Sequence, residues 1–248
     1  MRNLKITDLL RRYTLVHKCA GCSDILDFEH FDKAFCSDCE LSWRAALTES
    51  CNTCFKPAVE CECMPKLLSK EGALCLRRMF FYKSEHSGAP QMRAIYYLKD
   101  NKIRRVADFA AEQLCPTVRA ELDVLGADVS EVVICNVPRS KSSRVSNGFD
   151  QAEMVARSLG RRLGISYRRV LISSARARVQ KKLDKRERAE NAKKNIAIKR
   201  GADVKGKYVV LFDDMVTTGA SMAASVSLLR KSGAIGVLCF SLASKEKL

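Results

Sequence analysis

Two adjacent carboxylates and a small polar turn follow one apolar segment, and these residue types together have the chemistry of a ligand site. Residues 208–212 (YVVLF) are β-branched, aromatic and aliphatic, which is typical of a strand buried on both faces of a parallel sheet. Asp213 and Asp214 follow directly, and residues 217–221 (TTGAS) come next. Gly219 within this turn is free to adopt a positive φ.

A helix is expected to begin near Thr218, because Met222, Val226 and Leu229 recur with helical spacing. Backbone N–H groups and hydroxyls at such a helix N-terminus favour a phosphate. The two carboxylates beside it would accept sugar hydroxyls or bind a magnesium ion. A ligand that carries both a phosphate and a polyol would satisfy the whole stretch. The alternative is an ordinary strand–turn–helix with solvated acids at its mouth.

A second anion-binding segment is predicted from a second apolar stretch. Val132–Val137 (VVICNV) reads as a buried strand, and a loop rich in Arg, Lys and Ser follows it, with Arg139, Lys141 and Arg144 as its cations. Such a loop at the carboxyl end of a strand suits an anion. Asp150 is expected to cap a helix that runs to Arg162. Alone, this loop would be read as a solvated basic surface.

Eight of the 12 cysteines form four close pairs within the first 75 residues. The pairs are Cys19–Cys22, Cys36–Cys39, Cys51–Cys54 and Cys61–Cys63. Taken in sequence order they predict two tetrahedral zinc sites, each made by two successive pairs, in ribbon-like hairpins. Cys61-x-Cys63 is shorter than the usual Cys-x2-Cys, so whether it completes the second site is open. Buried free thiols are the alternative for all eight.

Composition places the chain among globular proteins, since 47% of its 248 residues are hydrophobic. No apolar run approaches the roughly 20 residues of a membrane span, and no signal peptide is recognisable. We therefore expect a cytoplasmic protein whose cysteines bind metal or stay reduced.

Positive charge is concentrated in the second part of the chain. Residues 1–75 carry 10 Lys and Arg against 11 Asp and Glu, whereas residues 76–248 carry 34 against 17. The densest stretch is 161–207, with 17 basic and 4 acidic residues. Such a field favours pyrophosphate, nucleotides or nucleic acid. Within it, residues 173–194 have little apolar content and dense charge, and they are expected to form a mobile flap.

The remaining periodic segments complete an α/β domain behind the cysteine-rich part. Strands are expected at 76–82, 195–199 and 233–241, and helices at 91–99 and 103–114, the last ended by Pro116. We predict a double zinc ribbon over residues 1–75 and a second domain with a mainly parallel sheet over residues 76–248.

The motifs after the strands resemble those of type I phosphoribosyltransferases. That resemblance implies that the turn holds the 5-phosphate of phosphoribosyl pyrophosphate (PRPP), and that Asp213 and Asp214 hold the ribose 2- and 3-hydroxyls. The loop after the first core strand would hold the pyrophosphate with magnesium. The implied ligand-binding residues are Val216, Thr217, Thr218, Gly219, Ala220, Ser221, Arg139, Lys141 and Arg144.

Taken in order, the motifs resemble the ComF family: a double zinc ribbon, Val137–Pro138, the helix start at 144–153, a basic segment and the DD-x-x-TTG motif. The helix start, RVSNGFDQAE, differs from the family pattern by one inserted residue and by Asp150 in place of asparagine.

The resemblance implies a phosphoribosyltransferase-like protein that binds PRPP and supports DNA uptake, transformation or recombination, with single-stranded DNA and DNA-uptake or recombination proteins as partners. Whether it catalyses transfer is open, because no acceptor pocket is legible in the sequence. The alternatives are a PRPP-responsive regulator and a non-catalytic factor that binds single-stranded DNA.

Overall fold

A computed structural model describes residues 17–27, 30, 32–82, 88–100, 103–139, 148–174 and 195–245. Its longer helices are α2 (Ser37–Leu47), α4 (Pro90–Asp100), α5 (Arg104–Leu125), α7 (Gln151–Leu163) and α9 (Ala220–Lys231), with a short α3 (Lys66–Lys70) and 3-10 turns η1 (Ala58–Glu60) and η3 (Val129–Glu131). Its strands are β1 (Ala73–Tyr82), β2 (Val132–Asn136), β3 (Ser166–Tyr167), β4 (Leu171–Ser173), β5 (Ile196–Ile198), β6 (Tyr208–Val216) and β7 (Gly236–Lys245).

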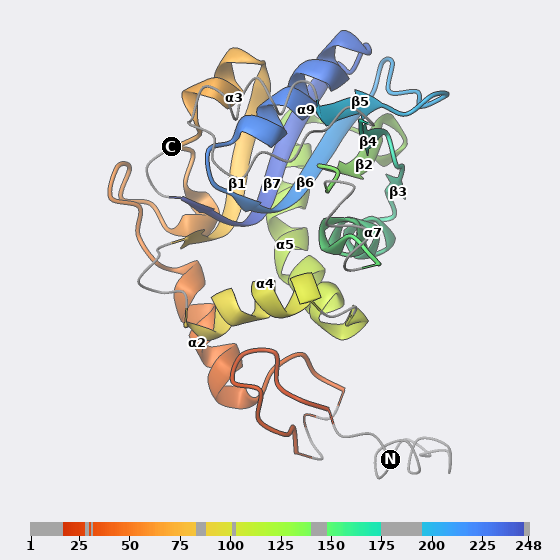
Figure 1. The fold of residues 1–248 in the computed structure, drawn as a ribbon. Coiled ribbons are helices and arrows are strands. Elements are labelled where there is room, and N and C mark those ends of the chain that lie inside the picture. Colours follow the sequence, from red (N-terminus) through yellow and green to blue (C-terminus); the bar gives the residue numbers. More distant parts are fainter. Residues whose placement is uncertain are drawn as a thin grey trace.

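Five of the strands form one parallel sheet in the order β1-β7-β6-β2-β3 (Figure 1). Strands β4 and β5 pair antiparallel with each other in a separate two-stranded sheet. Because parallel neighbours all end at the same edge, the carboxyl ends of β2 and β6 lie side by side. The predicted α/β class with a mainly parallel sheet is confirmed.

Alternation along β6 explains why its sequence is apolar without interruption. Val210 and Phe212 face a core that includes side chains of α4, α5 and α7, whereas Val209 and Leu211 face a second core shared with α3 and α9. Figure 1 shows the sheet between these two layers of helices.

The cysteine-rich segment packs against the first of these cores through aromatic side chains. The Trp43 ring on α2 lies 5.1 Å from Phe80 of β1 and 5.3 Å from Phe109 of α5, centroid to centroid. Phe35 lies 5.1 Å from Phe109 in the same cluster. This region is thus in direct contact with the sheet and helix α5, while the domain boundary after residue 75 stays a prediction.

The prediction that Pro116 ends a helix is wrong. Helix α5 continues through it to Leu125 and ends at Gly126, which has a φ of 60°. A proline inside a helix costs about 3 kcal/mol. Val118 and Leu122 are buried on the same helix face as Leu114, and burying two such side chains contributes roughly 3–6 kcal/mol, which outweighs that cost.

Strand ends also differ from the sequence expectation. Strand β1 begins at Ala73 and β7 spans Gly236–Lys245, because the two pair in parallel over almost their whole length. Strand β6 likewise continues to Val216, paired with β7 as far as Ser244. The described helices include none that is long and apolar enough to cross a membrane.

Candidate functional site

The two predicted carboxylates lie within the last half of β6 rather than after it. Asp213 is aligned with Ser241 of β7, and the strand continues two residues beyond Asp214. Although side chains along a strand alternate between its two faces, the carboxylates of Asp213 and Asp214 lie close enough to interact with each other. Asp214 is buried and Asp213 is half-buried.

The turn after β6 leads through a glycine into the N-terminus of helix α9 and lines a small pocket. Gly219 has a φ of 73°, a left-handed conformation that favours glycine, and it is the residue before the twelve-residue helix α9. The Ala220 N–H points to Thr218 Oγ1 at 3.4 Å. The first N–H groups of α9 have no partner within the helix itself. A small pocket of about 50 Å³ lies at this turn. It is lined by Asp213, Met215, Val216, Thr217, Thr218, Gly219, Ala220, Ser221 and Met222.

Electrostatics at the carboxylates favour a ligand that brings positive charge or hydrogen-bond donors. Burial and the adjacent Asp214 raise the pKa of Asp213 well above its ordinary range. Asp214 Oδ2 accepts a hydrogen bond of 2.6 Å from Gln151 Nε2 on α7, and Asp213 Oδ1 accepts one of 3.0 Å from the Asp214 backbone N–H. A cation or sugar hydroxyls at this edge would relieve the repulsion between the two carboxylates.

The end of β2 forms the facing wall of the site. Asp150 is buried and caps α7 by accepting the Glu153 N–H at 3.3 Å, as predicted. Its other oxygen accepts from the Arg139 N–H at 3.2 Å and from Asn136 Nδ2 at 3.3 Å. The Arg139 side chain has a buried nitrogen, Nη1, with no hydrogen-bond partner in the described part of the chain. Lys141 and Arg144 lie outside the described residues.

Three polar residues of this edge were not predicted as members of the site. Asn136 ends an otherwise apolar strand, and its Oδ1 accepts a 2.7 Å hydrogen bond from Tyr167 Oη. Gln151 reaches across from α7 to Asp214. A polar residue at the carboxyl end of a buried strand was the available signal for Asn136. No signal of residue type or spacing pointed to Tyr167 or to the partner of Gln151.

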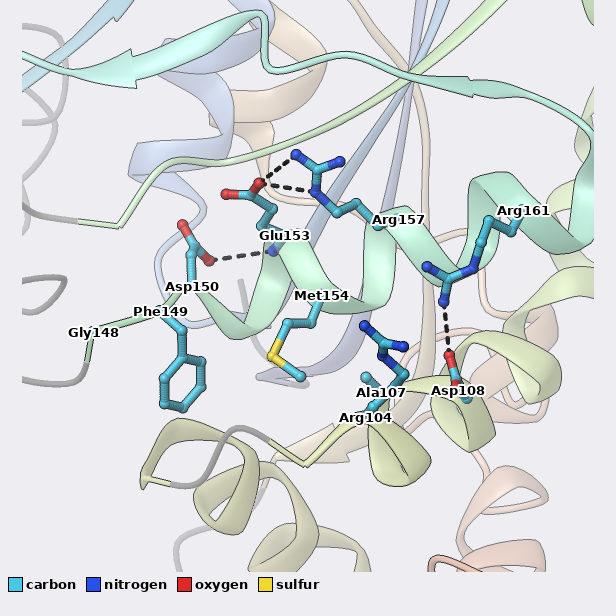
Figure 2. A pocket seen from close by; sticks show the side chains of 10 residues that line it. All are labelled: Arg104, Ala107, Asp108, Gly148, Phe149, Asp150, Glu153, Met154, Arg157 and Arg161. Atoms are coloured by element: carbon cyan, nitrogen blue, oxygen red, sulfur yellow. Dashed lines mark hydrogen bonds and ion pairs between the residues drawn. The ribbon is translucent and has the colours of Figure 1, made fainter.

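A larger cavity of about 470 Å³ lies beside this edge, between α5 and the start of α7 (Figure 2). Phe149 and Met154 give it an apolar wall, and Asp150 also lines it. Arg161 of α7 pairs with Asp108 of α5 at 3.1 Å and joins the two helices. Asp150 therefore links the cavity to the loop that begins at Arg139.

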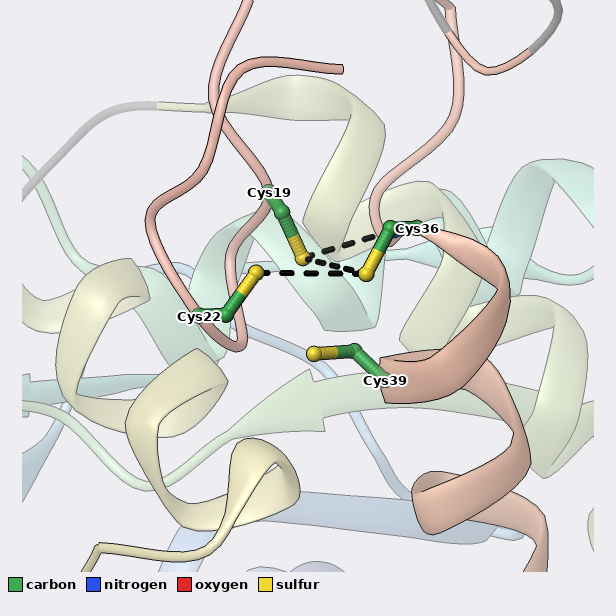
Figure 3. A group of neighbouring side chains, drawn as sticks. All are labelled: Cys19, Cys22, Cys36 and Cys39. Atoms are coloured by element: carbon green, nitrogen blue, oxygen red, sulfur yellow. Dashed lines mark hydrogen bonds between the residues drawn. The ribbon is translucent and has the colours of Figure 1, made fainter. Parts of the chain in front are cut away.

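The eight paired cysteines come together in the two predicted sets. Within each set the four sulfur atoms lie within 4.8 Å of one another. Figure 3 shows the first set, in which Cys36 Sγ lies 3.7 Å from Cys19 Sγ and 3.9 Å from Cys22 Sγ. In the second set, Cys54 Sγ and Cys61 Sγ are 3.6 Å apart. Tetrahedral zinc with Zn–S bonds near 2.3 Å separates sulfurs by about 3.8 Å, so both sets fit this metal.

Backbone donors around the thiols also suit a metal thiolate. The N–H groups of Gly21 and Cys36 point to Cys19 Sγ at 3.3 Å, and the Thr53 N–H points to Cys51 Sγ at 3.4 Å. Burial raises the pKa of Cys19, but such backbone donors outweigh it and bring the value to about 7.

A buried arginine accompanies the second set. Arg78 of β1 is 1% exposed and donates to the carbonyl of Cys63. Burial lowers the pKa of Arg78, and the charges of the four nearby thiols oppose that shift. Its Nε and Nη1 have no hydrogen-bond partner among the residues that the structure describes. The complex of a divalent cation with four thiolates carries a net negative charge. That charge would balance the positive charge of the Arg78 guanidinium.

Comparison with known proteins gives these features a family context. A family model described as "Phosphoribosyl transferase domain" matches residues 148–247. Competence protein ComFC of Streptococcus pneumoniae is 26% identical over 232 residues, which cover 89% of this chain and 92% of the relative. DNA utilization protein YhgH of Escherichia coli K12 is 27% identical over 149 residues, or 60% of this chain and 64% of the relative.

Among solved structures, adenine phosphoribosyltransferase from Thermoanaerobacter pseudethanolicus matches 58% of this chain and 82% of its own, with 16% identity and a TM-score of 0.36. The family matches confirm the resemblance read from the motifs. The chain is homologous to Competence protein ComFC and to YhgH, and it contains a phosphoribosyl transferase domain.

Proposed function

We propose that this protein binds PRPP together with magnesium at the carboxyl edge of its sheet. The 5-phosphate would be held by the turn 217–221 and the ribose hydroxyls by Asp213 and Asp214. The pyrophosphate would face Arg139 and the loop that follows it. The observation that supports this most strongly is the pocket at the N-terminus of α9, where a positive-φ glycine and a carboxylate line the same space.

Each group in this proposal has a chemical task. Asp213 and Asp214 accept the two hydroxyls and are placed to stabilise positive charge that develops on the sugar. Gln151 holds Asp214 in one orientation, and Asn136 with Asp150 holds the start of the pyrophosphate loop. Magnesium, when bound, would neutralise the pyrophosphate as a leaving group. A pyrophosphate-release assay distinguishes a transferase from a regulator that only binds PRPP.

The names of the relatives extend the proposal to a biological role. One is a competence protein and the other a DNA utilization protein. We therefore propose that PRPP binding by this chain serves the uptake or use of DNA.

Thermal unfolding provides the first test. PRPP with magnesium should raise the melting temperature, because it binds only the folded state. At a concentration one hundred times the Kd the stabilisation is about 2.7 kcal/mol, which corresponds to roughly 5–10 °C for a chain of this size. Ribose 5-phosphate is the control, since it lacks the pyrophosphate. An equal shift with ribose 5-phosphate, or no shift with PRPP, would mean that the site is misassigned.

A basic pocket formed by the residues that follow β3 and β5 supports a second candidate function, the binding of single-stranded DNA. It has a volume of about 290 Å³ and is lined by Arg168, Arg169, Lys199 and Arg200, with Asp203 as its acidic residue. Arg168, Lys199 and Arg200 are exposed. The predicted flap at 173–194 lies almost wholly outside the described residues. Within the basic stretch 161–207, this pocket is therefore the described feature on which DNA binding can be tested.

Salt dependence is the measurement for this second function. Affinity for single-stranded DNA should fall as salt rises, and the triple variant Arg168→Gln, Lys199→Gln, Arg200→Gln should flatten the slope of log K against log[salt] by about 2, since each contact contributes roughly 0.7. The matched variant Lys33→Gln, Arg44→Gln, Arg119→Gln removes the same charge from other exposed positions. Identical slopes for the two variants would exclude this pocket as the DNA surface.

A further inference from the structure

The turn that follows β6 is packed against the segment that leaves the second cysteine set. A methyl group added at Gly219 would lie 3.0 Å from Pro65 Cγ and 3.6 Å from Leu68 Cδ1. Pro65 and Leu68 are both buried, and Pro65 is only two residues after Cys63. The backbone of the proposed phosphate loop thus rests directly on residues 65–68.

Helix α3 cannot hold this position by its own stability. It has five residues, and an isolated helix of that length is unstable in water. Leu68 shares a core with Val216, Ala220 and Met222 around the loop. The placement of α3 therefore depends on what anchors its two ends, which are β1 on one side and the Cys61–Cys63 pair on the other.

Arg78 of β1 links the Cys61–Cys63 segment, which precedes α3, to the sheet. Its guanidinium donates to the Cys63 carbonyl from a buried position in β1, and its charge lies close to the thiols of the second set. Phe81, three residues further along β1, is buried against Cys51 and Cys61. The second set, β1, α3 and the phosphate loop are connected without a break by these contacts.

In the described part of the chain, the contacts of the first cysteine set lead to the other face of the sheet. It belongs to the core on the opposite face of the sheet, with Phe35, Trp43 and Phe80. It meets the later chain at Gly21, where an added methyl group would lie 2.9 Å from Pro90 Cβ, and at Lys18, whose carbonyl accepts a 2.7 Å hydrogen bond from Arg105 Nη2. The first set is therefore a control for the general effects of losing one metal ion.

We propose that metal bound by the second cysteine set positions the phosphate loop, through Pro65 and Leu68, and thereby sets its affinity for the 5-phosphate group of a sugar phosphate. This inference rests on the proposed function, because it deepens the role of the same site. Pro65 and Leu68 are positioning residues, which act on the ligand through the backbone of 217–221. The first set contributes to folding but not to this affinity.

Two single variants in the full chain test the proposal. Cys63→Ser and Cys22→Ser should each lower the zinc content from two ions to one. Cys63→Ser should weaken PRPP–magnesium binding, measured by calorimetry, by about tenfold or more, because the loss of a single hydrogen bond to a charged phosphate has an effect of that order. Cys22→Ser should leave the affinity unchanged. Equal losses in the two variants, or none in Cys63→Ser, would overturn the proposal.

A second pair of variants keeps all eight cysteines, so it tests the proposal even if Cys63→Ser misfolds. Leu68→Ala removes the contact under the loop, and Leu98→Ala removes a leucine that is equally buried in the opposite core. Both should retain two zinc ions and lose similar stability, but Leu68→Ala alone should weaken PRPP binding. If Leu98→Ala weakens it as much, the effect is general destabilisation and the inference fails.

Hydrogen exchange of the amides at 217–221 separates this inference from the proposed function. In the ligand-free protein, exchange there should be faster in Cys63→Ser than in Cys22→Ser. That difference would persist even if the wild type failed to bind PRPP, which would refute the proposed function alone. Equal exchange at 217–221 in both variants would refute the coupling whatever the ligand.

Discussion

Replacing both Asp213 and Asp214 by Asn is expected to abolish the stabilisation by PRPP with magnesium while the chain stays folded. The amides are nearly isosteric but cannot accept both ribose hydroxyls as carboxylates do, nor offset the charge of a magnesium complex. The full stabilisation expected for wild type, about 2.7 kcal/mol at one hundred times the Kd, should therefore disappear. Differential scanning fluorimetry with and without ligand measures this directly.

The same substitution should leave the ligand-free protein as stable as wild type or more so. The pKa of Asp213 is raised in the folded state, so the ionised form is less favourable there than in the unfolded chain. Stability is therefore lost as pH rises from the unfolded pKa, near 4, toward the raised folded value, and an uncharged amide removes that loss. The variant Asp38→Asn, Asp123→Asn, at two exposed positions, is the control and should keep the PRPP shift. An undiminished shift in the Asp213/Asp214 variant would contradict the assignment of the acids.

Removal of zinc is expected to have the largest effect on folding. Purified protein should contain two zinc ions per chain by elemental analysis, and a chelator that removes both should unfold at least the two cysteine sets and the described residues around them, up to residue 70. The apparent binding free energy of a structural zinc ion is about 10–16 kcal/mol, which equals or exceeds the roughly 5–15 kcal/mol by which an ordinary domain is stable. Trp43 is the single tryptophan and is buried beside the first set, so its fluorescence should shift to longer wavelength when the metal is lost.

The control for the zinc prediction is Cys115→Ser, because Cys115 belongs to neither set. This variant should keep both ions and its folded fluorescence. One ion per chain in the wild type would implicate the short Cys61-x-Cys63 pair. Folded protein that contains no zinc would refute the assignment of zinc to the two cysteine sets.

Much of this architecture follows from local sequence pattern. The apolar runs before Asp213 and within Val132–Val137 identify two neighbouring strands of the sheet, and Asp150 caps α7 as its type and position predict. The sulfur atoms meet in the sets that sequence order gives. These features are encoded by residues close together in the chain, where spacing alone limits the geometry.

What escaped prediction depends on contacts between distant residues. Pro116 is tolerated because buried side chains beyond it continue the apolar face of α5. Strand β6 runs past Asp214 because β7 pairs with it, and no local pattern requires that. The contact of Gln151 with Asp214 spans 63 residues, and that of Pro65 with Gly219 spans more than twice that distance along the chain. Such pairs become visible only when the tertiary structure brings them together.

A crystal structure of the protein with PRPP and magnesium would test the central claim most directly. We expect the 5-phosphate to lie against the backbone N–H groups of 217–221, with the ribose hydroxyls on Asp213 and Asp214 and the pyrophosphate toward Arg139. Ligand density elsewhere, or none at the N-terminus of α9 under saturating conditions, would contradict it.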